Sequence, residues 1–191
     1  MNQNQSSPLY SLGYVLYLPA TIITCFSHHL YLVTNHDFPK EEMGVSPIFV
    51  FLSFYIVVTM ILQFAFVCHL MKRKRIKGLH YTLITDLVAL LPFVGSWGSV
   101  ENVGNAFRDV GACWFLFTGL LIIWRIIYQI IALLTSQKTE SKNIKNGIKA
   151  ANIVVFLAAG ILLIQFGFLA IRDMELFLSE NGGILLGKDY I

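Results

Sequence analysis

The chain consists of long apolar runs separated by shorter polar segments. Four of the runs are long enough to cross a membrane, because a spanning α-helix needs about 20 apolar residues. These runs cover residues 9–33, 47–71, 113–134 and 148–171. A fifth run, 79–94, would rise only about 24 Å as an α-helix, which suits a short span packed inside a bundle.

The order of the runs predicts an all-α integral membrane protein with five transmembrane helices. We expect residues 9–135 to form a four-helix bundle and residues 148–171 to form one additional helix. A polar N-terminal tail (1–8), a basic cytoplasmic linker (136–147) and an extracytoplasmic tail (172–191) complete this division. No Lys or Arg precedes the first run, so we expect a retained helix rather than a cleaved signal peptide.

The composition supports this class of protein and excludes others. Hydrophobic residues make up 56% of the chain and charged residues only 13%, whereas an ordinary soluble domain has about 25% charged residues. Too little polar surface remains to cover a globule in water. A soluble single-domain enzyme and a disordered chain are both excluded.

The distribution of charge predicts the orientation of the helices. Residues 72–77 contain five basic residues and no acid, and residues 138–149 contain four lysines against Glu140 alone. Five spans place both segments on one face, which the positive-inside rule makes cytoplasmic. Nine of the eleven acidic residues lie outside these segments and outside the third run. We therefore predict a protein of the plasma (inner) membrane with a cytoplasmic N-terminus and an extracytoplasmic C-terminus.

Aromatic residues and one proline add local predictions. Trp97 and Trp114 flank the predicted outer loop, and Tyr14 and Tyr81 lie near the predicted inner boundary, as expected for belts at the membrane interfaces. Pro19 lies inside the first run and is expected to kink that helix.

Three polar residues fall at one depth inside three different runs. Asp86 lies about 10 Å from the inner end of its helix, and Gln63 and Arg125 lie about 12–13 Å from the inner ends of theirs. An unpaired charge at this depth costs several kcal/mol, and pairing offsets much of that cost. We predict an Asp86–Arg125 ion pair with Gln63 as its hydrogen-bonding neighbour. It is either a structural link between the third and fourth helices or part of a sensing or conducting device.

The third run also resembles a known family. Residues 86–93 read Asp-Leu-Val-Ala-Leu-Leu-Pro-Phe, which resembles the third helix of the voltage-sensor-like domain of the tetrameric cation channel (ion transport) superfamily. The order of elements is similar too: a basic run follows the second helix, and a basic linker leads to the fifth. The resemblance spans about residues 9–171 and implies a four-helix sensor-like bundle followed by one additional helix.

The chain departs from that family in the residues that sense voltage and conduct ions. Gln63 stands where the family usually has an acid, and Arg125 is the single basic residue of a helix that normally repeats Arg or Lys every third position. Steep voltage gating uses about three to four charges per subunit. No Thr-Val-Gly-Tyr-Gly-like filter occurs in the sequence. The resemblance therefore implies a degenerate module that lacks a pore filter.

Metal and redox chemistry has little support. His28, His29 and His36 are weak candidates for a metal site on the outer face, because their spacing matches no known ligand pattern. His69 and His80 lie at the opposite ends of their runs, too far in depth from the other histidines to share a haem. The three cysteines have no CxxC spacing, so neither a disulfide framework nor a zinc site is expected.

Two glycines predict a contact outside the bundle. Gly160 and Gly167 are seven residues apart and share one face of the predicted fifth helix. Small residues let helices approach closely in membranes, so this face is expected to contact another helix or subunit. The predicted partners are the lipid bilayer and other membrane subunits or further copies of the chain, and not nucleic acid.

These features favour a non-enzymatic multi-pass membrane protein that needs no cofactor. It would be a channel-like module, or a channel accessory subunit, without its own selectivity filter. Two alternatives stay open. The first is a structural subunit or assembly factor of a larger membrane complex, and the second is a membrane redox or metal protein that uses the outer histidines.

Overall fold

The computed structural model describes residues 8–35, 47–95, 108–136 and 142–185. Within these ranges the chain is helical apart from short turns and no strand occurs, so the predicted all-α class is confirmed. Four of the helices, all except the third, are long and apolar enough to cross a membrane. The five helices are α1 (Pro8–Asn35), α2 (Pro47–Lys72), α3 (Ile76–Gly95), α4 (Val110–Ser136) and α5 (Lys142–Leu185).

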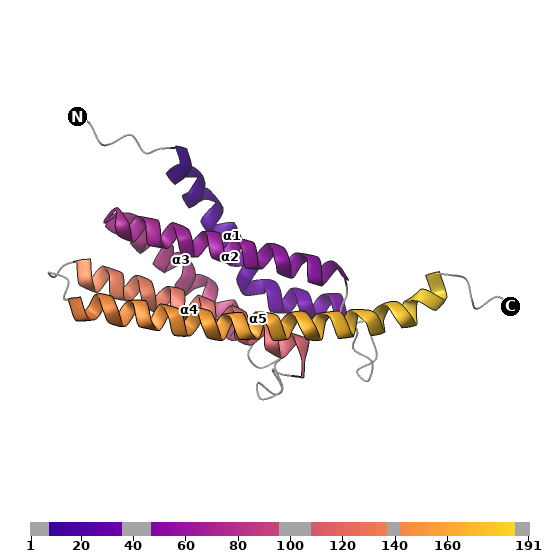
Figure 1. The fold of residues 1–191 in the computed structure, drawn as a ribbon. Coiled ribbons are helices and arrows are strands. Elements are labelled where there is room, and N and C mark those ends of the chain that lie inside the picture. The colour runs from indigo at the N-terminus through magenta and orange to yellow at the C-terminus, as the bar shows by residue number, and fades with distance from the viewer. Residues whose placement is uncertain (1–7, 36–46, 96–107, 137–141, 186–191) are drawn as a thin grey trace.

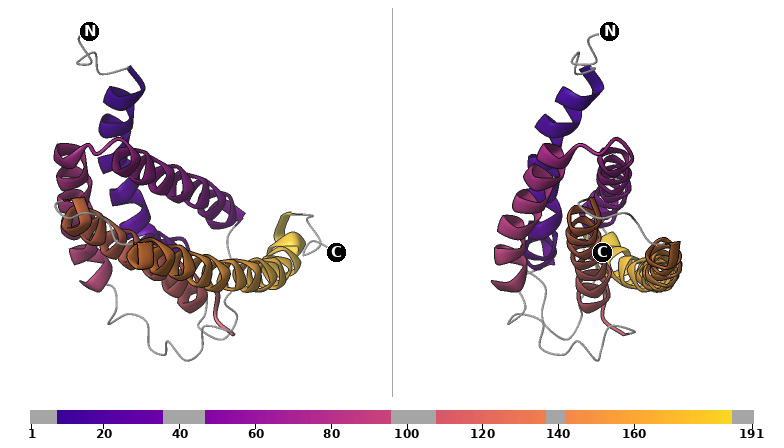
Figure 2. Two further views of the ribbon diagram at one scale, coloured as in Figure 1. Left: turned by 60° about the vertical axis from the view of Figure 1, so that its left-hand side comes forward. Right: turned by 90° about the vertical axis from the view of Figure 1, so that its left-hand side faces the viewer.

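Successive helices run in opposite directions (Figure 1). The turn from α2 to α3 lies at the end of the bundle where α1 begins, and α4 ends and α5 begins at that same end. The two basic segments of the sequence are therefore attached to one end of the molecule. Helices α1 to α4 pack around one another, whereas α5 lies mainly along α4 on the outside of the bundle (Figure 2).

Helix α1 contains Pro19 and changes direction along its length (Figure 1). Pro19 has no N–H to donate to the carbonyl of Val15, four residues earlier, so the helix loses one backbone hydrogen bond there. Two other carbonyls of this stretch accept hydrogen bonds from neighbouring helices. Tyr81 Oη donates to the Tyr14 carbonyl at 3.1 Å, and Gln63 Nε2 donates to the Tyr17 carbonyl at 3.2 Å.

The predicted bounds of the fifth helix, 148–171, were too narrow. α5 has 44 residues and includes the described parts of both the predicted linker (136–147) and the predicted tail (172–191). Hydropathy marks where a helix leaves an apolar layer, but backbone hydrogen bonding continues for as long as the residues favour a helix. At its length α5 rises about 66 Å, roughly twice the thickness of a hydrocarbon core.

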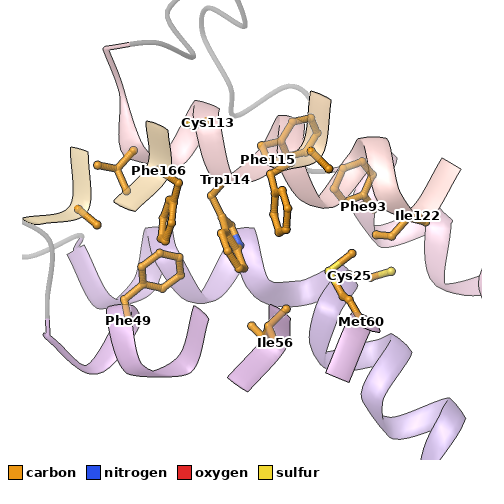
Figure 3. Packing of buried hydrophobic residues seen from close by; sticks show 14 of the residues in the cluster. Cys25, Phe49, Ile56, Met60, Phe93, Cys113, Trp114, Phe115, Ile122 and Phe166 are labelled. Atoms are coloured by element: carbon orange, nitrogen blue, oxygen red, sulfur yellow. The ribbon is translucent and has the colours of Figure 1, made fainter. Parts of the chain in front are cut away.

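The end of the bundle where α2 and α4 begin has an aromatic core (Figure 3). Trp114 lies at its centre, with ring centroids 5.9 Å from Phe49 and 4.8 Å from Phe166. The prediction that Trp114 lies at a membrane interface was wrong, because its side chain is 0% exposed and its Nε1 donates to Ser27 Oγ at 3.0 Å. Its partner in that prediction, Trp97, lies outside the described residues.

Candidate functional site

Asp86 on α3 and Arg125 on α4 meet in the interior of the bundle. Arg125 Nη2 donates to Asp86 Oδ1 at 2.8 Å, and Arg125 Nε donates to Asp86 Oδ2 at 2.9 Å. The Asp86 side chain is 0% exposed and the Arg125 side chain is 2% exposed. A guanidinium that contacts both oxygens of a carboxylate forms the strongest kind of ion pair in proteins and fixes its geometry. The structure thus contains the ion pair that the common depth of these residues predicts.

Gln63 on α2 lies where the depth argument predicts it. Its Oε1 accepts a hydrogen bond from Arg125 Nη1, and its Nε2 donates to Thr21 Oγ1 at 2.8 Å. Gln63 is 5% exposed. It therefore holds the second edge of the guanidinium and ties α4 to α1 through α2.

The Asp86 carboxylate accepts four hydrogen bonds. Besides the two from Arg125, Oδ2 accepts one from Tyr17 Oη at 2.9 Å and one from Gln129 Nε2 at 2.7 Å. Three of the four donors therefore lie at Oδ2 and one lies at Oδ1. Thr82 Oγ1 in turn donates to Gln129 Oε1 at 2.6 Å. We call this set of side chains the central network: Tyr17, Thr21, Gln63, Thr82, Asp86, Arg125 and Gln129.

All four bundle helices contribute to the central network, and sequence analysis missed four of its members. Gln129 and Thr82 could have been found from spacing, since each lies four residues from a predicted partner, Arg125 or Asp86, on the same helix face. Tyr17 lies at a similar depth in the first run. The sequence gives no comparable sign for Thr21, whose hydroxyl also donates to the Tyr17 carbonyl within α1.

The network is electrically neutral and buried, with no member more than 5% exposed. It holds one positive and one negative group, and the Arg125 guanidinium also lies 5.4 Å from the centre of the Tyr17 ring, a favourable cation–π distance. Taking two charges out of water is repaid only when the geometry is good and the remaining polar atoms are satisfied. Here donors from α1 and α4 surround the carboxylate of α3, so the arrangement is suited to holding helices in register.

The other predicted site residues are not gathered into a site. His36 and the side chains of His28 and His29 lie outside the described part of the structure. Among the residues that are described, no three His, Cys, Asp or Glu side chains lie close enough to hold a metal ion. The three cysteines are free thiols.

No helix of this chain packs on Gly160 or Gly167 within the described regions. A Cβ placed on either glycine would meet no atom within 4 Å. The interhelical contact predicted for them is therefore absent inside the bundle, because α5 turns other residues toward the core. The apolar residues of α5 that are less than 5% exposed are Ala159, Phe166, Leu169 and Ala170.

No protein-family model, curated protein or solved structure matches this chain. The resemblance of residues 86–93 to voltage-sensor-like domains stays a prediction from the sequence.

Proposed function

We propose that this protein is a non-enzymatic, multi-pass membrane protein. It is a channel-like, voltage-sensor-like module or channel accessory subunit without its own selectivity filter, and it acts through helix contacts with partner subunits. The central network carries this proposal, because it joins α1, α2, α3 and α4 around one buried ion pair in the interior of the bundle.

Five membrane spans fit the arrangement of the helices. α3 has 20 residues, which rise about 30 Å and match the thickness of a hydrocarbon core. Five spans also account for the attachment of both basic segments to the same end of the bundle, which we assign to the cytoplasm. The N-terminus is then cytoplasmic and the C-terminus extracytoplasmic.

A fixed module is favoured over a voltage sensor by the energies involved. Moving one charge through 100 mV yields about 2.3 kcal/mol. Removing Arg125 from Asp86 would leave a buried charge unpaired, at a cost of about 3–5 kcal/mol. The membrane potential is therefore too weak to move Arg125 by itself. The same argument supports the alternative in which the chain is a structural subunit of a larger membrane complex.

The exposed face of α5 is where we expect partners to bind. α5 packs mainly on α4, and Gly160 and Gly167 lie on a surface that nothing in the described chain covers. Neighbouring side chains on this helix, Leu157, Ile161, Ile164 and Phe168, are all more than 60% exposed. Such a surface can contact lipid or a second helix, and the glycines would allow close approach.

Site-specific photocrosslinking in native membranes tests this function. A photoreactive side chain at Gly160 should give a defined crosslinked species, either with a partner subunit or with a second copy of the chain. The same group at Ala159, which is buried against the bundle, is the matched control and should crosslink only within the chain. If neither position yields an intermolecular product, the accessory role is wrong.

Cysteine labelling tests the orientation separately. In a background without the native cysteines, a cysteine at position 140 should react with an impermeant reagent only after the membrane is opened. Labelling of that position from outside intact cells would contradict the proposed topology.

A further inference from the structure

The turn between α2 and α3 has an unusual backbone. Arg75 N–H donates to the Leu70 carbonyl at 3.0 Å, and Lys74 N–H donates to the Met71 carbonyl at 2.9 Å. This pair of hydrogen bonds is the Schellman pattern that ends many helices, and it needs a left-handed residue that is usually glycine. Here that residue is Lys74, with φ of 50°. The turn therefore keeps a lysine where glycine would remove the strain.

The same turn carries a concentrated positive charge. Five of the residues 72–77 are basic and none is acidic. The ion pairs among the described residues, Asp86–Arg125 and Arg172–Asp173, lie elsewhere. Arg75 lies 4.7 Å from the centre of the Tyr10 ring, so aromatic contact rather than a carboxylate holds it in place. The positive charge of the turn is therefore not neutralised by a described acidic residue, and it can attract an anion from outside the described chain.

A shallow hollow of about 450 Å³ opens beside this turn. It lies between α1 and α3 and is lined by Tyr14, Val15, Lys77, Gly78 and Tyr81. The Tyr14 hydroxyl forms one wall, since a Cβ added to Gly78 would lie 2.1 Å from it. Tyr81 already donates to a backbone carbonyl, whereas the Tyr14 hydroxyl donates to no described residue.

The hollow combines three features that attract an anion with one that attracts an acyl chain. Lys77 supplies a full charge, Tyr14 supplies a hydroxyl donor, and the first turn of α3 presents backbone N–H groups at the positive end of the helix. Val15, on the remaining wall, is apolar and 69% exposed. It belongs to the candidate span Tyr10–Ser27, so this wall faces the apolar layer.

We propose that this hollow binds the phosphate headgroup of an anionic phospholipid, with an acyl chain lying over Val15. The basic turn attracts the lipid, and Lys77 and Tyr14 hold its phosphate. This proposal rests on the proposed insertion of the bundle in a membrane. Clusters of basic residues at the cytoplasmic end of a span commonly recognise anionic lipids, and the hollow gives this cluster a defined binding position.

The test uses the purified full-length chain in nanodiscs of phosphatidylcholine that contain increasing fractions of spin-labelled phosphatidylglycerol. We expect the protein to retain the phosphatidylglycerol probe in a saturable way. It should not retain a phosphatidylcholine probe in this way. The Lys77→Gln variant should weaken retention about tenfold or more, because it removes the charged hydrogen bond to the phosphate. Lys77→Arg should restore most of it, and Tyr14→Phe should weaken it as well.

Lys149→Gln is the matched control, because Lys149 is exposed near the same end of the molecule but lies on α5, away from the hollow. If the hollow is the site, it should change retention by no more than about fivefold, the effect of general surface charge. An equal loss for Lys77→Gln and Lys149→Gln would mean diffuse surface charge and would overturn the proposal. Competition by millimolar inorganic phosphate as effective as competition by the lipid would assign the site to free phosphate and also overturn it.

Failure of this proposal is distinguishable from failure of the proposed function. Carbonate extraction reports whether the chain is embedded in the membrane at all. An embedded chain without phosphatidylglycerol preference refutes the lipid site alone, whereas a chain released by carbonate refutes both.

Discussion

The two halves of the bundle interior are built in different ways. Where α2 and α4 begin, Trp114, Phe49 and Phe166 pack as rings with a single hydrogen bond from the tryptophan. Toward the other end, Asp86 and Arg125 stand at the centre of a network in which each contact has a direction and a fixed partner. One half is held by contact area and the other by hydrogen bonds.

The two halves contribute differently to the bundle: one fixes how the helices are rotated, and the other fills the space between them. In a membrane, apolar side chains gain little by leaving lipid, so ring packing alone constrains helix rotation weakly. The Asp86 carboxylate takes its four hydrogen bonds from side chains at fixed positions on α1 and α4, so each of them depends on the rotation of its helix. The central network therefore sets which way each helix faces, and the aromatic core fills the space that this choice creates. Three tests can break or sharpen this comparison.

The largest effect is expected from breaking the ion pair. Asp86→Asn should leave Arg125 without a counter-charge and lower the free energy of unfolding by about 3–5 kcal/mol, and Arg125→Gln should do the same to Asp86. The double substitution should recover much of the loss, because two amides can hydrogen-bond each other and Gln63. Denaturant unfolding in detergent gives the coupling energy of this double-mutant cycle.

The surface pair Arg172–Asp173 provides the control for that cycle. Arg172 is 55% exposed in its ion pair with Asp173, so Arg172→Gln should cost no more than about 1 kcal/mol. A coupling energy near zero between positions 86 and 125 would show that the network does not set the register of α3 against α4.

A medium effect is expected from overfilling the aromatic half. A Cβ on Gly119 would lie 2.7 Å from Phe93 Cζ, and Phe93 is stacked on Phe115 with ring centroids 4.4 Å apart. Gly119→Ala should therefore destabilise the bundle by about 1–3 kcal/mol in the same unfolding measurement. Gly160→Ala, where the Cβ meets nothing, should be neutral or stabilising by up to about 1 kcal/mol. Equal effects at both positions would mean that the ring stack yields freely.

The smallest effect is expected from removing the hydrogen bond of Trp114 in the aromatic half. Trp114→Phe keeps an aromatic ring against Phe49 and Phe166 but loses the hydrogen bond to Ser27. We expect a loss of about 1 kcal/mol from the missing bond, together with a small packing loss. If Trp114→Phe costs as much as Asp86→Asn, the two halves do not differ in the way described above.

The helices were predicted well because each one is built around a long run of apolar residues, which can be read directly from the sequence. The ends of α5 were predicted poorly, since the helix continues through polar residues that hydropathy treats as linker or tail. Trp114 was misplaced for a related reason. Position along a helix gives the depth of a residue, but not whether it points to lipid or to a neighbouring helix.

The same limit explains what was found of the central network. Depth alone brought Asp86, Arg125 and Gln63 together, because charges at one level in an apolar layer have strong reason to pair. The hydroxyls of Thr21 and Thr82 have no such energetic signature, since each can donate to a carbonyl of its own helix. The Tyr17 hydroxyl donates to Asp86 on another helix, but a tyrosine carries no charge that would single it out in an apolar run. Their part in the network depends on helix rotation, which nearly uniform apolar helices do not encode in their pattern.

In the proposed membrane topology, the ion pair also affects the order of events during synthesis. Asp86 and its partner Arg125 are separated by 39 positions. At about 5–20 residues per second this separation corresponds to a delay of about 2–8 s. During that interval α3, which is not among the helices apolar enough to span by composition, presents an aspartate that disfavours insertion by about 2.5–3.5 kcal/mol. We therefore expect α3 to stay at the insertion machinery, unreleased to lipid, until α4 arrives with the arginine.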